Sequence, residues 1–190
     1  MANTKVITGP DTLWSYVHVW EPYSIQGSNP KYSVQLRIPK SDIVTLEKIE
    51  KAMRAAYEEG ASKLKGNGKS MPAYEDLKKP LRDGEKAFPG DAAYEGYMFI
   101  NANNTQAPGI VDKDRNRIEE HREVYSGCFG RASITFYTFN SNGNKGIACS
   151  LNNLQKLKDG PVLGGHSRAE DDFADEDEDK DDSYDDDDDY

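Results

Sequence analysis

The sequence predicts a mainly β protein with one principal helix, followed by a disordered acidic tail. Runs rich in β-branched and aromatic residues recur along the chain with apolar and polar positions alternating, as in half-buried strands. One long segment, residues 43–59, instead repeats apolar residues at helical spacing. Residues 168–190 contain fifteen acidic side chains and few apolar ones, so they cannot bury enough surface to fold.

The first predicted strand covers residues 12–20. If this strand alternates regularly, its three large aromatic rings share one face, while Leu13, Val17 and Val19 share the other. Two interpretations remain open for the aromatic face, which is either a second core layer or a surface on which bases stack. The rings of this face belong to Trp14, Tyr16 and Trp20, with His18 between them.

The next two segments predict a strand and then the principal helix. Residues 32–38 alternate apolar residues with a polar outer face that includes Arg37, and Pro39 ends the strand. Ser41 is placed to cap the helix that follows. We expect the apolar stripe of this helix to pack against the sheet.

Residues 60–90 are predicted to form a long loop without regular structure, because they contain five glycines and three prolines. The lysines of this segment either stay solvated or contact a sugar-phosphate backbone, since such contacts need charge and reach rather than fixed geometry. Gly66 and Gly68 are not followed by the Gly-Lys-Ser/Thr ending of a phosphate-binding loop. Nucleotide hydrolysis is therefore not expected.

Three further strands are predicted in the second half of the chain. Residues 94–102 form one of them, and residues 131–139 and 145–151 form a hairpin. The hairpin turns at Asn142-Gly143, a pair that readily adopts the positive φ angles of a tight reversal. Leucines at a spacing of three between residues 151 and 157 predict a short terminal helix.

The net charge of −10 hides an uneven distribution. Residues 168–190 contain fifteen acidic and two basic side chains, which leaves 22 basic and 19 acidic ones in residues 1–167. We therefore expect one mildly basic domain, residues 1–167, joined to a polyanionic tail, residues 168–190. Because the sequence has neither a leader pattern nor eighteen consecutive apolar residues, we expect a cytoplasmic protein that contacts no membrane.

No group of side chains predicts catalysis, a cofactor or a metal site. Cys128 and Cys149 match no zinc-binding spacing, so we expect both to be reduced core residues. Residues 112–123 resemble a calcium loop, but Arg117 stands where that loop needs glycine. We therefore expect a binding protein and not an enzyme.

The predicted order of strands admits a five- or six-stranded barrel of the oligonucleotide/oligosaccharide-binding (OB) type. Six short segments carry a further signal: Leu81–Gly84, Gly96–Ala102, Val124–Cys128, Gly143–Ile147, Leu151–Gln155 and Lys158–Gly160. Together they resemble a family of bacteriophage single-stranded DNA-binding proteins, and the resemblance covers most of residues 5–165. It implies an OB-fold core that binds single-stranded DNA with little sequence preference.

We therefore predict a protein that binds and protects single-stranded DNA during phage replication, recombination or repair in the infected bacterial cell. Aromatic rings would stack bases and basic side chains would neutralise phosphates, with no more than about half of the rings reaching DNA and the others in the core. The predicted DNA-binding residues are Trp14, Tyr16, Trp20, Arg37, Lys63, Lys65, Lys69, Lys78, Lys79, Arg82, Tyr97, Phe99, Arg131, Tyr137, Phe139 and Lys145.

The acidic tail resembles those of replicative phage single-strand binders, which contact polymerase and other replication proteins. We expect it to compete with DNA for the basic surface and to recruit replication or recombination proteins, although a purely solubilising tail is an alternative. The predicted partner-binding residues are Asp185, Asp186, Asp187, Asp188, Asp189 and Tyr190. The alternative function is a protein-interaction or DNA-mimic module acting through the tail, and whether the chain forms a homodimer stays open.

Overall fold

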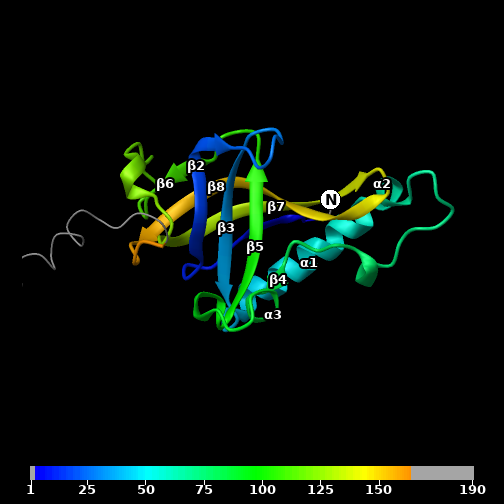
Figure 1. Cartoon of the computed structure of the whole chain (residues 1–190), viewed down its shortest axis with the longest axis horizontal. Coiled ribbons are helices and arrows are strands. Elements are labelled where there is room, and N and C mark those ends of the chain that lie inside the picture. The colour runs from blue at the N-terminus through cyan, green and yellow to red at the C-terminus, as the bar shows by residue number, and fades with distance from the viewer. Residues whose placement is uncertain (1–2, 164–190) are drawn as a thin grey trace, which may run out of the picture.

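Hydrogen bonds between strands close a barrel in the computed structural model, which describes residues 3–163 (Figure 1). Its strands pair in the order β7-β2-β3-β5-β8, and a further pairing of β7 with β8 closes the ring. The barrel strands are β2 (Leu13–Tyr23), β3 (Lys31–Pro39), β5 (Tyr97–Asn104), β7 (Phe129–Ser141) and β8 (Asn144–Lys158).

The ring is closed unevenly. β7 and β8 pair over the whole length of their hairpin, whereas β2 and β7 share a single residue pair, Leu13 with Phe129. β5 and β8 run parallel, and the other barrel neighbours run antiparallel. A partly open, five-stranded barrel is the OB architecture, so the predicted fold class is confirmed.

Short elements decorate the barrel, several of them within residues 60–90, where the sequence predicted no regular structure. The three short strands each lie beside one barrel strand, since β1 pairs with β7, β4 with β5 and β6 with β8. Among residues 3–163, no helix is long and apolar enough to cross a membrane. The short elements are β1 (Lys5–Ile7), α2 (Ala61–Lys65), η1 (Tyr74–Asp76), β4 (Arg82–Asp83), α3 (Gly84–Ala87), η2 (Ala92–Tyr94), β6 (Gly109–Val111) and η3 (His121–Glu123).

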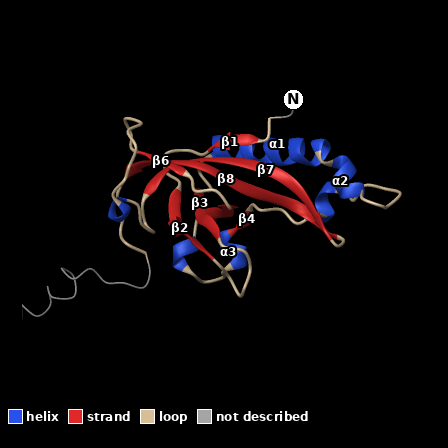
Figure 2. Cartoon of the chain, turned by 90° about the horizontal axis from the view of Figure 1, so that it is seen from above, coloured by secondary structure: helices blue, strands red, loops and turns tan. Residues whose placement is uncertain are grey.

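The principal helix, α1 (Ile43–Glu59), lies where the sequence predicts it. Its cap is Asp42 and not Ser41, because the Asp42 carboxylate accepts a hydrogen bond from the Thr45 backbone amide at 3.2 Å. Ile49 and Met53 are buried on its inner face. α1 packs along β1 and β7, on the side of the barrel away from β2 and β3 (Figure 2). The outer face of β2 and β3 is thus not covered by α1.

A bulge in β2 corrects the predicted faces of its aromatic rings. Between Ser15 and His18 the strand has one residue more than the facing segment of β3, and Tyr16 adopts a φ of 47°. The extra residue shifts the alternation, so Trp14 points inward, as Val19 does, and is fully buried. Tyr16 is 61% exposed instead. The four rings therefore do not share one face.

The predicted terminal helix is wrong, since β8 continues as a strand to Lys158. Register shifts against β7 leave Asn152 and Leu157 as extra residues in β8. A bulge at Asn152 adds one residue between Leu151 and Leu154, which lets both side chains point into the barrel at a spacing of three. The bulge therefore gives two buried leucines of a strand the spacing of three that is typical of a helix.

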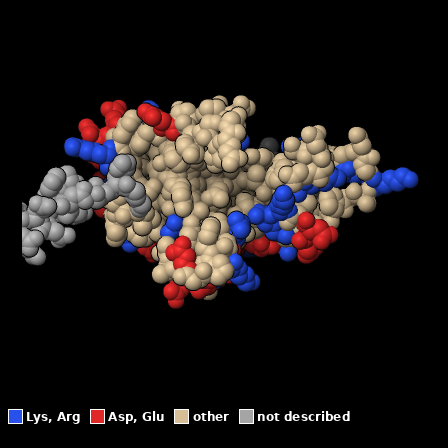
Figure 3. All heavy atoms as spheres, viewed as in Figure 1, with Lys and Arg blue, Asp and Glu red and all other residues tan. Residues whose placement is uncertain are grey.

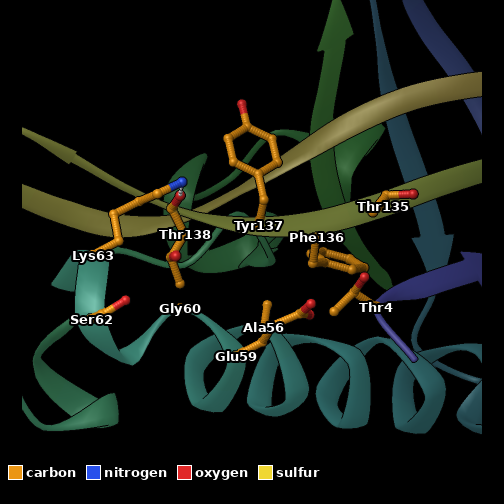
Figure 4. Close-up of a pocket in the computed structure, with 10 residues that line it drawn as sticks. All are labelled: Thr4, Ala56, Glu59, Gly60, Ser62, Lys63, Thr135, Phe136, Tyr137 and Thr138. Atoms are coloured by element: carbon orange, nitrogen blue, oxygen red, sulfur yellow. Dashed lines mark hydrogen bonds between the residues drawn. The ribbon is translucent and has the colours of Figure 1, made fainter. Parts of the chain in front are cut away.

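The β7–β8 hairpin extends beyond the barrel and is held from below by the junction of α1 and α2 (Figure 1). Thr138 faces Gly60 at this junction, and a Cβ atom on Gly60 would lie 1.9 Å from Thr138 Oγ1 (Figure 4). Lys63 Nζ donates to the Thr138 carbonyl at 3.2 Å, and Asn140 Nδ2 donates to the Lys63 carbonyl at 3.1 Å. These contacts fix the hairpin on the helical layer.

Candidate nucleic-acid interface

The outer face of β2, β3 and β5 forms a groove with a volume of about 390 Å³. Regular alternation on β3 and β5 brings short polar side chains to this face, while their apolar neighbours fill the barrel. The segment between β4 and β5 folds back to supply one wall. The groove is lined by the rings of Tyr16, His18, Tyr23, Phe88 and Tyr94 and by the polar side chains of Ser33, Gln35, Asn101 and Asn103.

Several of the lining rings are open to solvent. Tyr23 is 52% exposed and Phe88 39% exposed, in addition to Tyr16. His18 and Tyr23 stack on each other with centroids 4.4 Å apart and an interplanar angle of 12°. Exposed aromatic rings beside neutral amides and hydroxyls can receive the flat, apolar faces of nucleic acid bases.

A three-layer stack stabilises the wall of the groove. The Tyr94 ring has the Phe88 ring 4.3 Å away and the Arg37 guanidinium 4.1 Å away, so the two neighbours occupy its opposite faces. The Tyr94 hydroxyl donates to Gln35 Oε1 at 3.0 Å. The Phe88 ring forms the exposed end of this stack.

Arg37 lies under this wall, only 5% exposed. Its guanidinium donates to Gln35 Oε1 at 3.1 Å, to the Ala93 carbonyl at 3.2 Å and to Ser15 Oγ at 3.0 Å. The Tyr94 hydroxyl, which is close to that of Tyr16, raises the pKa of Tyr16 above its ordinary value.

Charge is distributed unevenly around the groove. The face over β2, β3 and β5 is largely uncharged, and most of the Lys and Arg side chains in this view gather on the side of α2 and the β7–β8 hairpin (Figure 3). Arg82 is closer, with its guanidinium 5.3 Å from the centre of the Phe99 ring. The groove offers stacking, and basic side chains lie beyond its edge.

Only part of the predicted site lies at this groove. Tyr16 lines it, Arg37 lies buried under its wall, and Arg82 lies next to it. Trp14 and Phe99 are almost completely buried, so neither ring offers a face to a base. Trp20 is partly buried, and its ring stacks on His121 at 4.4 Å. We leave these three rings out of the binding surface.

The other predicted residues do not line the groove. Arg131 donates to the Thr8 carbonyl at 3.2 Å, and the Lys79 ammonium lies 4.4 Å from the centre of the Tyr74 ring. Tyr97, half-buried, lies at the start of β5 opposite Pro39. The remaining residues lie elsewhere: Lys63 and Lys65 on α2, Lys69 in the loop that follows it, Lys78 paired with Gly146 of the hairpin, and Tyr137, Phe139 and Lys145 on the hairpin itself.

Several lining residues were missed by sequence reasoning. Phe88 belongs to the predicted loop of residues 60–90, where no pattern distinguishes it from its neighbours. Tyr94 is predicted to begin a strand, but it lies in η2, between β4 and β5. Asn101 and Asn103 belong to the polar positions of β5, and regular alternation alone could have placed them together on the outer face. The predicted partner-binding residues, Asp185 to Tyr190, lie outside the described residues.

Comparisons with known proteins agree with this architecture. A 159-residue alignment with protein p50 of the Acyrthosiphon pisum secondary endosymbiont phage 1 is 28% identical and covers 80% of this chain and 82% of that protein. The solved complex of the bacteriophage Enc34 single-stranded DNA-binding protein with single-stranded DNA is similar with a TM-score of 0.72 and 23% identity, over 85% of this chain and 90% of that one.

The bacteriophage T7 single-stranded DNA-binding protein gp2.5 shares the fold at 17% identity, with a TM-score of 0.58 over 90% of this chain and 93% of that one. A family model described as "Enterobacter phage Enc34, ssDNA-binding protein" matches residues 4–184, which is nearly the whole chain. The chain therefore belongs to the Enc34 family of phage single-stranded DNA-binding proteins.

Proposed function

We propose that this protein binds single-stranded DNA, with little sequence preference, in the groove over β2, β3 and β5. The observation that carries the proposal is the set of exposed rings, Tyr16, Tyr23 and Phe88, on the outer face of an OB barrel. Each stacked base contributes about 1–3 kcal/mol, and any base has a face to stack. Duplex DNA keeps its bases paired and stacked, so the groove favours the single strand.

Basic side chains would hold the sugar-phosphate backbone as the strand leaves the groove. Arg82 lies nearest, and the lysines around α2 and the hairpin extend the positive surface to one side. Each neutralised phosphate makes the affinity more sensitive to salt, because bound counterions are released. We therefore expect affinity to fall as the salt concentration rises.

The proposal includes roles for the acidic tail and for the protein in the cell. The fifteen acidic residues of the tail compete with DNA for the basic surface, and they recruit replication or recombination proteins once DNA has displaced them. The protein would protect single strands during replication, recombination or repair of phage DNA, in the cytoplasm of the infected bacterium. The phage origin of the relatives supports this setting.

The direct test is a fluorescence titration of the full chain with labelled oligo-dT and with duplex DNA of equal length, at two salt concentrations. We expect tight, salt-dependent binding to the single strand and much weaker binding to the duplex. Equal binding to both would contradict the groove as a stacking site. No binding to either would favour the alternative function, a module that engages proteins through its acidic tail.

A further inference from the structure

A second pocket, with a volume of about 330 Å³, adjoins the proposed groove. Tyr16 and Tyr94 line both spaces and separate them. The two spaces differ in chemistry, because the groove is aromatic and neutral whereas the pocket contains the Arg37 guanidinium. Its other polar lining groups include the side chains of Ser15, Asp91 and Ser126.

Arg37 is a buried cation without an anionic partner among residues 3–163. Its three hydrogen bonds go to neutral acceptors on Ser15, Gln35 and Ala93, and no carboxylate of the described residues lies within ion-pair distance. A guanidinium has five N–H donors, so two remain for a ligand. Removing an unpaired charge from water is costly, and an anion in the pocket would offset that cost.

The backbone around the pocket is shaped by the β2 bulge. Tyr16 has a backbone φ of 47°, a conformation that residues other than glycine seldom adopt. Such backbone conformations are often found at functional sites. The Val17 amide beyond the bulge donates to Ser126 Oγ at 3.1 Å. The bulge therefore turns the Tyr16 ring outward between the two spaces and ties β2 to the Ser126 side of the pocket.

We propose that the Arg37 pocket holds a backbone phosphate of the DNA strand whose bases stack in the adjoining groove. The inference rests on the proposed function and deepens it. One DNA strand would pass over Tyr16, with its bases in the groove on one side of this ring and a phosphate in the pocket on the other. Asp91, whose carboxylate accepts from the Ala93 amide at 3.0 Å, lowers the positive potential of the pocket. A singly charged phosphodiester fits such a pocket better than a dianion.

A carboxylate of the acidic tail is the other source of an oxyanion. Leu163 lines the pocket, and its amide donates to the Ser126 carbonyl at 2.8 Å. The chain continues from Leu163 into the residues that contain the fifteen acids. A test must therefore separate phosphate from carboxylate.

The first experiment measures oligo-dT affinity as a function of salt for variants of the full chain. Asp91→Asn keeps an oxygen to accept from the Ala93 amide but removes the negative charge, so it should tighten binding about 2–5-fold at low salt. Glu58→Gln, on α1, removes one negative charge away from the pocket and should change affinity less. Arg37→Gln should reduce the slope of log affinity against log salt by about 0.7, the value for one phosphate on a single strand.

The second experiment needs no substitution in the pocket and so does not depend on a variant that folds. It records the NMR signal of Arg37 Nε–H in the full chain during titration with an abasic deoxyribose-phosphate oligomer. Movement of this signal with the abasic oligomer, as with oligo-dT, supports the phosphate site. Movement with added NaCl alone, and not with the oligomer, would assign the pocket to tail carboxylates and overturn the proposal.

The two proposals can fail separately. If oligo-dT binds but neither Asp91→Asn nor the Arg37 signal responds, the pocket proposal is overturned and the groove proposal remains. If oligo-dT does not bind at all, the proposed function fails and the pocket proposal fails with it.

Discussion

Single residues decide which rings of this barrel are available for stacking. Trp14 and Tyr16 are two positions apart on one strand, yet one is fully buried and the other is 61% exposed. A regular strand would give them the same side, but the bulge at Tyr16 separates them. Gly130 matters to the buried ring, because a Cβ there would lie 2.7 Å from Trp14 Cζ2.

Phe88 offers the sharpest test of the groove, because Tyr137 is a control with the same exposure. Both side chains are 39% exposed, but only Phe88 lines the groove. We expect Phe88→Leu to weaken oligo-dT binding by about 1–3 kcal/mol, the contribution of one stacked base. Tyr137→Leu should weaken it much less, as measured by the same fluorescence titration. A larger loss of affinity for Tyr137→Leu than for Phe88→Leu would indicate that DNA binds at the hairpin and not in the groove.

Trp14 should matter to stability and not to DNA. Trp14→Ala removes a buried indole whose Nε1 donates to the Gly130 carbonyl at 3.2 Å, so it should lower the free energy of unfolding by about 3–5 kcal/mol. Urea denaturation measures this loss. The folded fraction should bind oligo-dT as tightly as the wild type, and if Trp14→Ala does not fold, Trp14→Phe serves instead. A stable variant with weakened binding would contradict the core assignment.

At the scale of elements, the segment that follows α2 is anchored to α1 by Tyr74. Its hydroxyl donates to Glu50 Oε1 at 3.2 Å, and the Arg54 guanidinium lies 4.4 Å from the centre of its ring. The nearby Tyr57 ring meets it edge to face at 5.4 Å. This cluster holds the segment around Tyr74 beside the helix. It thereby sets where the backbone of Lys78 and Lys79, which follow it, lies.

The titration of Tyr74 should make stability depend on pH at high pH. Burial, followed by the nearby Glu50 carboxylate, raises the pKa of Tyr74 to about 12 from an ordinary value of 10. The folded state holds this proton more tightly than the unfolded state, so its contribution is complete below pH 10 and is lost between about pH 10 and 12. The loss should be on the order of 2 kcal/mol.

Tyr74→Phe isolates this contribution from the other groups that titrate in the same range. The variant keeps the ring that contacts Arg54 and Tyr57 but has no proton to lose. Denaturant unfolding of both proteins at pH 9, 10, 11 and 12 should show the wild type losing more stability than the variant. Parallel curves would contradict the raised pKa.

The junction of α1 and α2 with the hairpin gives a second prediction at this scale. Gly60→Ala would place a Cβ 1.9 Å from Thr138 Oγ1, so the helical layer and β7 must move apart (Figure 4). We expect a loss of about 1–3 kcal/mol in thermal or urea unfolding. Adding Thr138→Ala removes the closest atom and should restore part of the stability. An unchanged Gly60→Ala variant would contradict this packing.

At the scale of the whole molecule, the chain combines a mildly basic body with a strongly acidic tail. A truncated protein of residues 1–167 lacks the tail, so it should bind oligo-dT more tightly than the full chain, most of all at low salt. Fluorescence titration at several salt concentrations measures the difference. Equal affinity at every salt concentration would contradict competition by the tail and leave recruitment or solubility as its role.

The sequence by itself determined the mainly β class, the position of the long helix and the hairpin around Asn142-Gly143, because these depend on local periodicity and turn chemistry. The choice of an OB barrel depended on the resemblance to a family. The resemblance of short segments to a phage family also led to the family that the comparisons show. Local patterns were enough to predict an element wherever its structure depends on residues that are close together along the chain.

Only the tertiary structure decided which residues form the candidate interface. The bulges at Tyr16 and Asn152 change the side of the residues that come directly after them, and no sequence pattern marked them. Phe88 and Tyr94 reach the groove because the segment between β4 and β5 folds back over the barrel, a contact between residues far apart in sequence. Periodicity predicts faces within a strand, whereas an interface depends on where separate strands and loops meet in space.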